Sequence, residues 1–367
     1  MAISTIGASA LDSGVSQLGK NLIQNGSFVV AQRGTSFTGL GTAAAYTLDR
    51  WKLDINGSPQ ARVTITQDTD VPSGQGFASS LKIDVTTAES SVAAGETFHV
   101  FQNIEAQNLQ LLAYNTASAK TMVLSFWFKS PKSGTHCVTI DNQDGGSTYI
   151  REFTVASADT WEKHSVTFPG DTAAGINNDN GTGLTLIFPL INGTSYQGTA
   201  NTWTGSGTQW STSNQQNLLD NTANNIYITG VQLEVGSVAT DFEHEDYGTT
   251  LQKCYRYFQA IYIDNNAGHA AEASGSTSAY TAMIPYLSYN WRATPSASIR
   301  TNVNMRYRSY LSGFISATTS STAGNGAFPY APGFYISCSG TLSGVTDGMP
   351  GLLNATGTML VDFSAEL

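Results

Sequence analysis

Hydrophobic and polar residues alternate in short runs along most of the chain. In 61–66 and 80–85 every second residue is apolar, and clusters rich in Gly, Asn, Asp and Pro separate such runs. A period of two is typical of a β-strand that buries one face and exposes the other. Many short strands joined by turns predict an all-β protein built as a sandwich.

One segment, 247–258, departs from this alternation. Leu251, Tyr255 and Phe258 fall on one face of a short helix there, and the acidic stretch 241–246 precedes it. The distribution of hydrophobic and polar residues therefore predicts four parts. These are an N-terminal arm over 1–20, a first β domain over 21–246, a linker helix over 247–258 and a smaller β domain over 259–367.

Composition narrows the classes of partner. Only 12% of the 367 residues are charged, the formal net charge is −10, and the 17 Lys and Arg residues are scattered. Nucleic acid needs a clustered basic surface, so we expect no nucleic-acid partner. The first residues lack the basic and apolar regions of a signal peptide, and no stretch is long and apolar enough to cross a bilayer. We expect neither a signal peptide nor membrane insertion.

Motifs for nucleophilic or metal chemistry are missing from the sequence. It contains no GxSxG, HExxH or Walker loop, and its five His residues have no metal-ligand spacing. Cys137, Cys254 and Cys338 are far apart, which favours buried reduced thiols over disulfides or a metal site. We expect no catalytic residues and no metal ligands, although 27 acidic residues leave a glycosidase pair open.

Several blocks carry a resemblance to a known family. The opening Asn21–Phe28 with Leu48–Trp51, and the later segments 124–130, 160–171 and 228–236, resemble the jelly-roll carbohydrate-binding module of bacteriophage fibre proteins. The blocks occur in the family's order and cover about residues 21–258. The resemblance implies a jelly-roll β-sandwich followed by a second, smaller antiparallel β-sandwich domain.

The resemblance also implies a function. It suggests a phage virion protein, a tail fibre or receptor-binding adhesin, that binds a glycan of the host surface without catalysis. Such fibres are usually homotrimers, and residues 1–20 would attach the protein to other virion proteins. Two alternatives stay open, which are a capsid-decorating head fibre or tail adaptor with a structural role, and a polysaccharide depolymerase.

The chain departs from the related modules of polysaccharide-degrading enzymes at their structural calcium. Those modules bind the ion through an acidic residue after the first strand's Phe and a carboxylate pair in the closing strand. Here Val29 follows Phe28, and the closing strand reads Thr229-Gly230. Calcium prefers carboxylate oxygens. We therefore expect no cofactor, and bound calcium stays the alternative.

Candidate glycan contacts come mainly from one polar segment, 196–216. A sugar presents C–H groups on its face and hydroxyls at its rim, so its site needs aromatic rings beside hydrogen-bonding side chains. The segment supplies both, in Tyr196, Trp203, Trp210, Asn201 and Gln209. The alternative for Trp203 is a buried anchor of the loop.

The remaining tryptophans are assigned by strand pattern. Trp127 alternates away from the apolar side chains of its strand, so it is a further candidate glycan contact. Trp51 and Trp161 stand within strongly patterned blocks, and we expect both in the core.

Overall fold

The computed structural model describes residues 20–263, 271–275, 279–284, 291–301, 305–309, 313–317, 320–328, 331–339, 349–355 and 359–367. Side chains are described for 20–260, 291–296, 298, 300 and 362–367. The predicted arm over 1–20 lies outside the described residues except for Lys20. The chain divides into two compact units, residues 1–250 and 251–367.

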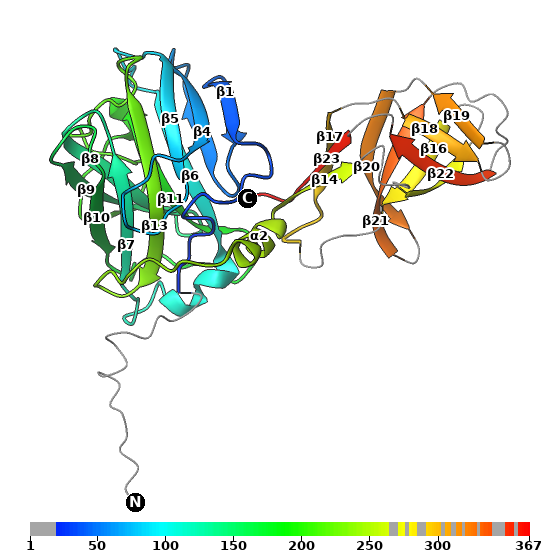
Figure 1. Cartoon of the computed structure of the whole chain (residues 1–367). Helices are drawn as coiled ribbons and strands as arrows, with labels where there is room; N and C mark the ends of the chain where they lie inside the picture. Colours follow the sequence, from blue (N-terminus) through cyan, green and yellow to red (C-terminus); the bar gives the residue numbers. More distant parts are fainter. Residues whose placement is uncertain are drawn as a thin grey trace, which may run out of the picture. The chain divides into compact units, whose positions relative to one another are not determined.

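The first unit contains two antiparallel sheets (Figure 1). The six-stranded sheet has the order β1 (Ser36–Leu40), β4 (Arg62–Asp68), β5 (Ser80–Thr87), β13 (Asn225–Val235), β7 (Met122–Lys129) and β10 (Glu162–Phe168). The seven-stranded sheet has the order β12 (Trp203–Thr204), β9 (Ser147–Val155), β8 (Gly134–Asn142), β11 (Thr182–Asn192), β6 (Thr97–Glu105), β3 (Lys52–Asn56) and β2 (Ala45–Tyr46). Two short 3-10 helices, η1 (Ala106–Leu112) and η2 (Thr194–Tyr196), follow β6 and β11.

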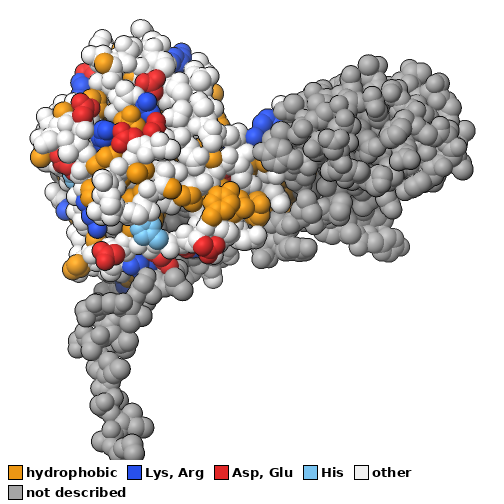
Figure 2. All heavy atoms as spheres, viewed as in Figure 1, with side chains coloured by type: hydrophobic (Ala, Val, Ile, Leu, Met, Phe, Trp, Pro, Cys, Tyr) orange, Lys and Arg blue, Asp and Glu red, His pale blue; other side chains and the backbone are white. Residues whose placement is uncertain are grey.

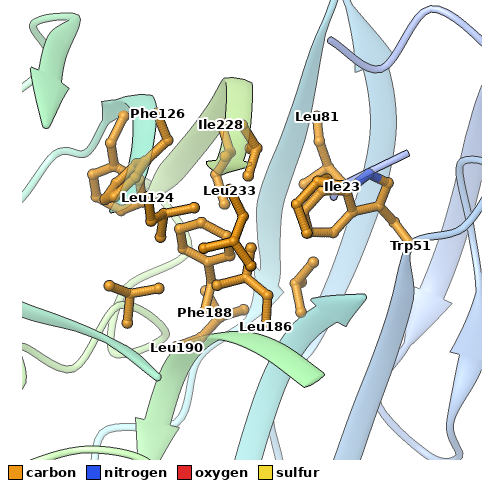
Figure 3. Close-up of a cluster of buried hydrophobic side chains, with 14 of the residues drawn as sticks. Ile23, Trp51, Leu81, Leu124, Phe126, Leu186, Phe188, Leu190, Ile228 and Leu233 are labelled. Atoms are coloured by element: carbon orange, nitrogen blue, oxygen red, sulfur yellow. The ribbon is translucent and has the colours of Figure 1, made fainter. Parts of the chain in front are cut away.

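The core lies between these sheets because each strand turns its apolar positions inward. In β7, Leu124, Phe126 and Phe128 are buried, whereas Trp127 and Lys129 are only partly buried. Figure 3 shows the resulting cluster, in which side chains from the two sheets point toward one another (Ile23, Trp51, Leu81, Leu124, Phe126, Leu186, Phe188, Leu190, Ile228 and Leu233). Removing such apolar surface from water is the main stabilising term of a sandwich of this kind.

The expected all-β fold is confirmed, and so is the core position of Trp51. Its indole is fully buried, lies 4.9 Å from the Phe28 ring and donates a hydrogen bond from Nε1 to the Asn25 carbonyl. The core assignment of Trp161 is wrong. Val166 and Phe168 of β10 point inward, so Trp161, at odd spacing from them, belongs to the outer face. There its Nε1 donates to Asp70 Oδ1 at 2.8 Å.

The second unit is also built of antiparallel strands. A three-stranded sheet has the order β14 (Phe258–Ile263), β23 (Met359–Ser364) and β17 (Ser296–Thr301). A seven-stranded sheet has the order β19 (Gly313–Ala317), β18 (Met305–Ser309), β22 (Met349–Ala355), β15 (Ala271–Gly275), β16 (Ala279–Ile284), β21 (Ala331–Ser339) and β20 (Ser320–Phe328). The helix expected over 247–258 is α2 (Tyr247–Tyr255), and Phe258 already begins β14.

Two further expectations concern cysteines and membranes. Cys137 and Cys254 are buried, as expected, and Cys137 is a free thiol, whereas the side chain of Cys338 lies outside the described residues. Among the described residues, no helix has the length and apolar character that a membrane crossing requires.

Candidate functional site

A groove of about 430 Å³ runs across the outer face of the seven-stranded sheet. Four adjacent strands and one loop form it. Its lining consists of Asp54, Ile55 and Asn56 of β3, Thr97, His99, Phe101 and Asn103 of β6, Thr182, Thr185 and Ile187 of β11, Asp141 and Gln143 at the end of β8, and Trp210 of the loop after β12.

Strand alternation supplies the lining of the groove. In β6 the odd positions from Thr97 to Asn103 face the groove, whereas the even positions Phe98 and Val100 are buried in the core. The register then sets these residues side by side. Asp54 lies opposite His99, and Asn103 lies opposite Thr185, which lies opposite Asp141.

Trp210 is the aromatic side chain at the centre of this arrangement, and three neighbours hold it. Its Nε1 donates a hydrogen bond to Asp141 Oδ2 at 3.0 Å. The His99 ring meets it edge-on at 5.1 Å, and the Tyr196 ring stacks on it at 5.1 Å with an interplanar angle of 18°. Hydrogen bonds from Trp210 N to the Tyr196 carbonyl and from the Thr139 hydroxyl to the Trp210 carbonyl fix the loop itself. The indole is therefore preorganised before any ligand arrives.

Tyr196 stacks on Trp210 but does not itself line the groove. It ends η2, is half-buried, and its hydroxyl is hydrogen-bonded to Asn56 Nδ2. The structure thus brings together two of the candidate residues, Tyr196 and Trp210, and only Trp210 lines the groove. Whether they contact a glycan stays a prediction.

Asn201 and Gln209 are outside the groove lining. Asn201 is exposed, has φ of 65° and accepts a hydrogen bond from Arg151 Nη1 at 2.5 Å. Gln209 is half-buried, and its side chain lies close to Gly198. Both residues shape the loop that carries Trp210.

Trp203 is turned toward the core instead of the groove. It pairs with Tyr149 in β9 and packs against the rings of Tyr149 at 5.2 Å and Tyr114 at 5.9 Å. Its Nε1 donates to the Pro169 carbonyl at 2.9 Å. These contacts match the alternative stated for this residue, an anchor of the loop.

Trp127 lies on the outer face of the opposite, six-stranded sheet. It is half-buried and pairs with Lys163 of β10 and Thr229 of β13. Trp161 lies on the same face, with its ring 6.1 Å from that of Tyr227 of β13. Figure 2 shows one side of the first unit, on which charged side chains of both signs lie beside hydrophobic ones. Trp127 is therefore not part of the groove.

The electrostatics of the groove follow from its partial burial. Burial raises the pKa of the Asp141 carboxyl to about 6, against the lowering effect of the hydrogen bonds from Trp210 and Gln143. Burial also raises the pKa of Asp54, although Lys52 lowers it in part. The His99 ring is buried, which lowers its pKa to about 4 despite its hydrogen bond with Asn192. At neutral pH the imidazole is uncharged and the Asp141 carboxylate is charged.

Reasoning from the sequence missed most of the residues that line the groove. The candidate residues came mainly from a loop, where binding residues are common, whereas the missed residues stand in strands (Asp54, His99, Phe101, Asn103 and Asp141). A signal did exist, because these residues occupy the outward positions of alternating strands. It could not show that four separate strands lie side by side.

The residues at the expected calcium position do not fit the ion. The Phe28 and Val29 carbonyl oxygens accept hydrogen bonds from Gln67 Nε2 at 2.7 and 3.1 Å. Thr229 Oγ1 donates to the Ser79 carbonyl, and Gly230 has no side chain. Among the residues with described side chains, no group of three or more His, Cys, Asp or Glu could hold a metal ion. The carbonyl oxygens of Phe28 and Val29, which a cation would need as ligands, thus accept hydrogen bonds from the Gln67 amide.

Comparisons with known proteins find likeness only among solved structures, since no model of a protein family matches the chain and no curated protein matches it. The chain is similar to the enzymatically active domain of tailspike protein 4 of bacteriophage CBA120, with 15% identity over 59% of this chain and a TM-score of 0.31. That match covers 22% of the tailspike chain.

Two carbohydrate-binding modules are also similar. One belongs to family 4, with 16% identity, 58% of this chain and 99% of that chain covered, and a TM-score of 0.30. The other is the family 11 module of a cellulosomal cellulase of Clostridium thermocellum, with 12% identity, 57% and 96% covered, and a TM-score of 0.28. At these identities and scores, the likenesses by themselves decide nothing about what this chain binds.

Proposed function

We propose that the chain is a glycan-binding protein without catalytic activity and that the groove on the seven-stranded sheet holds the glycan. The observation that carries this proposal is Trp210, an indole fixed at the groove between Tyr196, His99 and Asp141. A sugar ring can stack its C–H face on an indole while its hydroxyls bond to neighbouring carboxylates and amides. The groove supplies such groups in Asp141 and Asn103. Its volume, about 430 Å³, lies within the ordinary range of ligand sites.

The spacing of the two groove carboxylates supports binding over hydrolysis. Asp54 and Asp141 stand on β3 and β8, with β6 and β11 between them, and the register offsets them by a further four residues. Roughly 4.8 Å per strand and 3.3 Å per residue put their backbones about 19 Å apart. Glycosidases need carboxyl groups about 5–10 Å apart. This pair is suited to holding a ligand at two ends.

The test compares two matched tryptophans. Trp210 and Trp161 are both half-buried, and the Nε1 of each donates to an aspartate, but they lie against the outer faces of different sheets. We expect Trp210→Ala to weaken glycan binding at least about tenfold, since stacking on an aromatic ring and its preorganisation are lost together. Trp161→Ala should leave binding unchanged. The measurement is the affinity of the wild type and of both variants for each member of an array of bacterial-envelope and plant polysaccharides. Thermal melting of each variant verifies that it is folded. Equal losses in both variants would count against the groove, and failure of the wild type to bind any glycan would refute the function.

We further propose that the protein acts in a phage virion, as a tail fibre or receptor-binding adhesin that attaches to host glycan. The support is the resemblance of the blocks from Asn21–Phe28 to 228–236, described above, to phage fibre modules. A single shallow groove binds weakly, so a homotrimer would gain on the order of a hundredfold in avidity where geometry permits. Residues 1–20 would contact other virion proteins.

This finer proposal has its own tests. Light scattering on the purified full chain should give three times the 38.9 kDa of one chain. Immunogold electron microscopy should label the tail, and excess protein should block phage adsorption. Label on the capsid without a block of adsorption would indicate a decorating head fibre instead. Release of reducing ends from host polysaccharide would indicate a depolymerase.

A further inference from the structure

The side chains that line the groove differ from the rest of the surface in their charge. Asp54 and Asp141 face it near opposite ends, and none of its lining residues, all of which have described side chains, is Lys or Arg. Lys52 stands beside this lining on β3. Its ammonium group lies 5.3 Å from the Tyr46 ring centroid and 5.5 Å from that of Phe101, so it is engaged with two rings.

His99 does not add a positive charge to the groove near neutral pH. It is only 4% exposed, its Nε2 is hydrogen-bonded to Asn192, and Trp210 covers it edge-on. Charging an imidazole in that position would require burying a cation away from water. Among the lining residues, the formal charge therefore comes from the two carboxylates, and the ammonium of Lys52, which lowers the pKa of Asp54, offsets part of the negative charge at that end.

Carboxylates with this placement favour ligands that donate hydrogen bonds. Asp141 is only 2% exposed, and its carboxylate already accepts hydrogen bonds from Trp210 and Gln143. A ligand hydroxyl can donate to the remaining acceptor positions. A carboxylate, sulfate or phosphate on the sugar would instead bring a like charge into a partly desolvated site, where repulsion is weakly screened.

Building on the proposed function, we propose that this groove selects uncharged, hydroxyl-rich glycans and rejects anionic ones. The selectivity resides in Asp54 and Asp141, one near each end of the groove. The net charge of −10 on the whole chain adds a long-range repulsion of the same sign.

The experiment uses matched ligands and the full chain. The probes are β-glucan, β-galactan and mannan, together with the neutral members of the array that bind, each beside its own C6-oxidised form, in which hydroxymethyl groups have become carboxylates. At pH 7.5 and low salt we expect the neutral form to bind at least about tenfold more tightly, equivalent to ~1.4 kcal/mol. Raising ionic strength from ~0.01 to ~0.5 M should narrow this ratio, because the Debye length shortens.

Variants then assign the effect to residues. The double variant Asp54→Asn with Asp141→Asn keeps an oxygen acceptor at each position, and we expect it to lose most of the discrimination. Asp84→Asn, which removes the same charge from β5 of the opposite sheet, is the matched control and should keep the wild-type ratio.

Two results would overturn the selectivity while leaving the function in place. One is equal or tighter binding of oxidised glycans by the wild type, and the other is an unchanged ratio in the folded double variant. Absence of binding to every neutral and acidic glycan has a different meaning, because it removes the proposed function and the selectivity with it.

Discussion

Asp141 is almost completely buried, so water hydrates its carboxylate poorly. Burial raises the pKa of this carboxyl to about 6 from an ordinary value of 3.8. An acid with a raised pKa in the folded state holds its proton more tightly there than in the unfolded chain. Its contribution to stability is present in full below about pH 3.8 and is lost as pH rises through about 6.

Asp141→Asn should therefore stabilise the protein at neutral pH. An amide oxygen can still accept the hydrogen bond from Trp210, and no charge is buried. We expect the free energy of unfolding to rise by on the order of 2–3 kcal/mol at pH 7.5 and by about a third as much at pH 4.5, where most of the folded-state carboxyl is protonated. Urea denaturation at both pH values measures this difference. A variant less stable than the wild type at pH 7.5 would mean that the carboxylate charge itself is needed.

The turn before the first strand shows how side-chain amides organise an element. Asn25 has φ of 54°, accepts a bond from Val30 N and donates to the carbonyls of Val30 and Asp49. Gln67 of β4 donates to the carbonyls of Phe28 and Val29. Gly26 lies so close to β13 that an added Cβ would stand 2.1 Å from the Val231 carbonyl oxygen. The side-chain amides of Asn25 and Gln67 thus fix the conformation of this turn, and Gly26 allows it to pack closely against β13.

Gln67→Ala tests this arrangement. Loss of the amide leaves the buried Phe28 carbonyl without its donor, which should lower the free energy of unfolding by about 1–3 kcal/mol. Gln60→Ala, at an exposed position, is the control and should have little effect.

The same turn predicts how the protein responds to a chelator. Because the Gln67 amide already bonds to the carbonyl oxygens at the calcium position of the related modules, we expect EDTA to leave the melting temperature of the wild type unchanged. A marked drop in EDTA would point to a bound metal instead.

At the scale of the molecule, the main hydrophobic cluster belongs to the first unit alone. Its buried members run from Ile23 to Leu233, and all lie within residues 1–250. A unit with its own core is expected to fold independently.

A fragment of residues 20–250 should therefore fold and retain glycan affinity. We expect one cooperative transition in calorimetry, and single-site binding equal to that of the full chain within about threefold. Binding should be compared with immobilised protein at low density, so that avidity does not enter. A fragment without a cooperative transition would show that the second unit is needed for folding.

Local pattern predicted the all-β fold and the inward residues of β5 and β7 correctly. The alternation shows which side chains of these strands point inward, because a strand has only two faces. It does not show that Val123 and Ser125, on the other face of β7, are buried as well. The same rule would have moved Trp161 to the outer face, since it is out of phase with Val166 and Phe168. That error came from treating a patterned block as core without following its phase.

Pattern could not predict which strands share a groove. Asp54, His99 and Asp141 are separated by long stretches of sequence and meet only because β3, β6, β11 and β8 are neighbours in one sheet. Trp203 and Trp210 stand in the same polar segment, yet one packs on the core and the other lines the groove. Their spacing in the chain carries no information about that choice.

The sequence by itself determined the period, the turns and hence the class of fold, because these depend on neighbours along the chain. Only the tertiary structure decided the site, because strand order and register set residues from four strands and a loop side by side. The burial that raises the pKa of Asp141 and fixes Trp210 arises from the same packing.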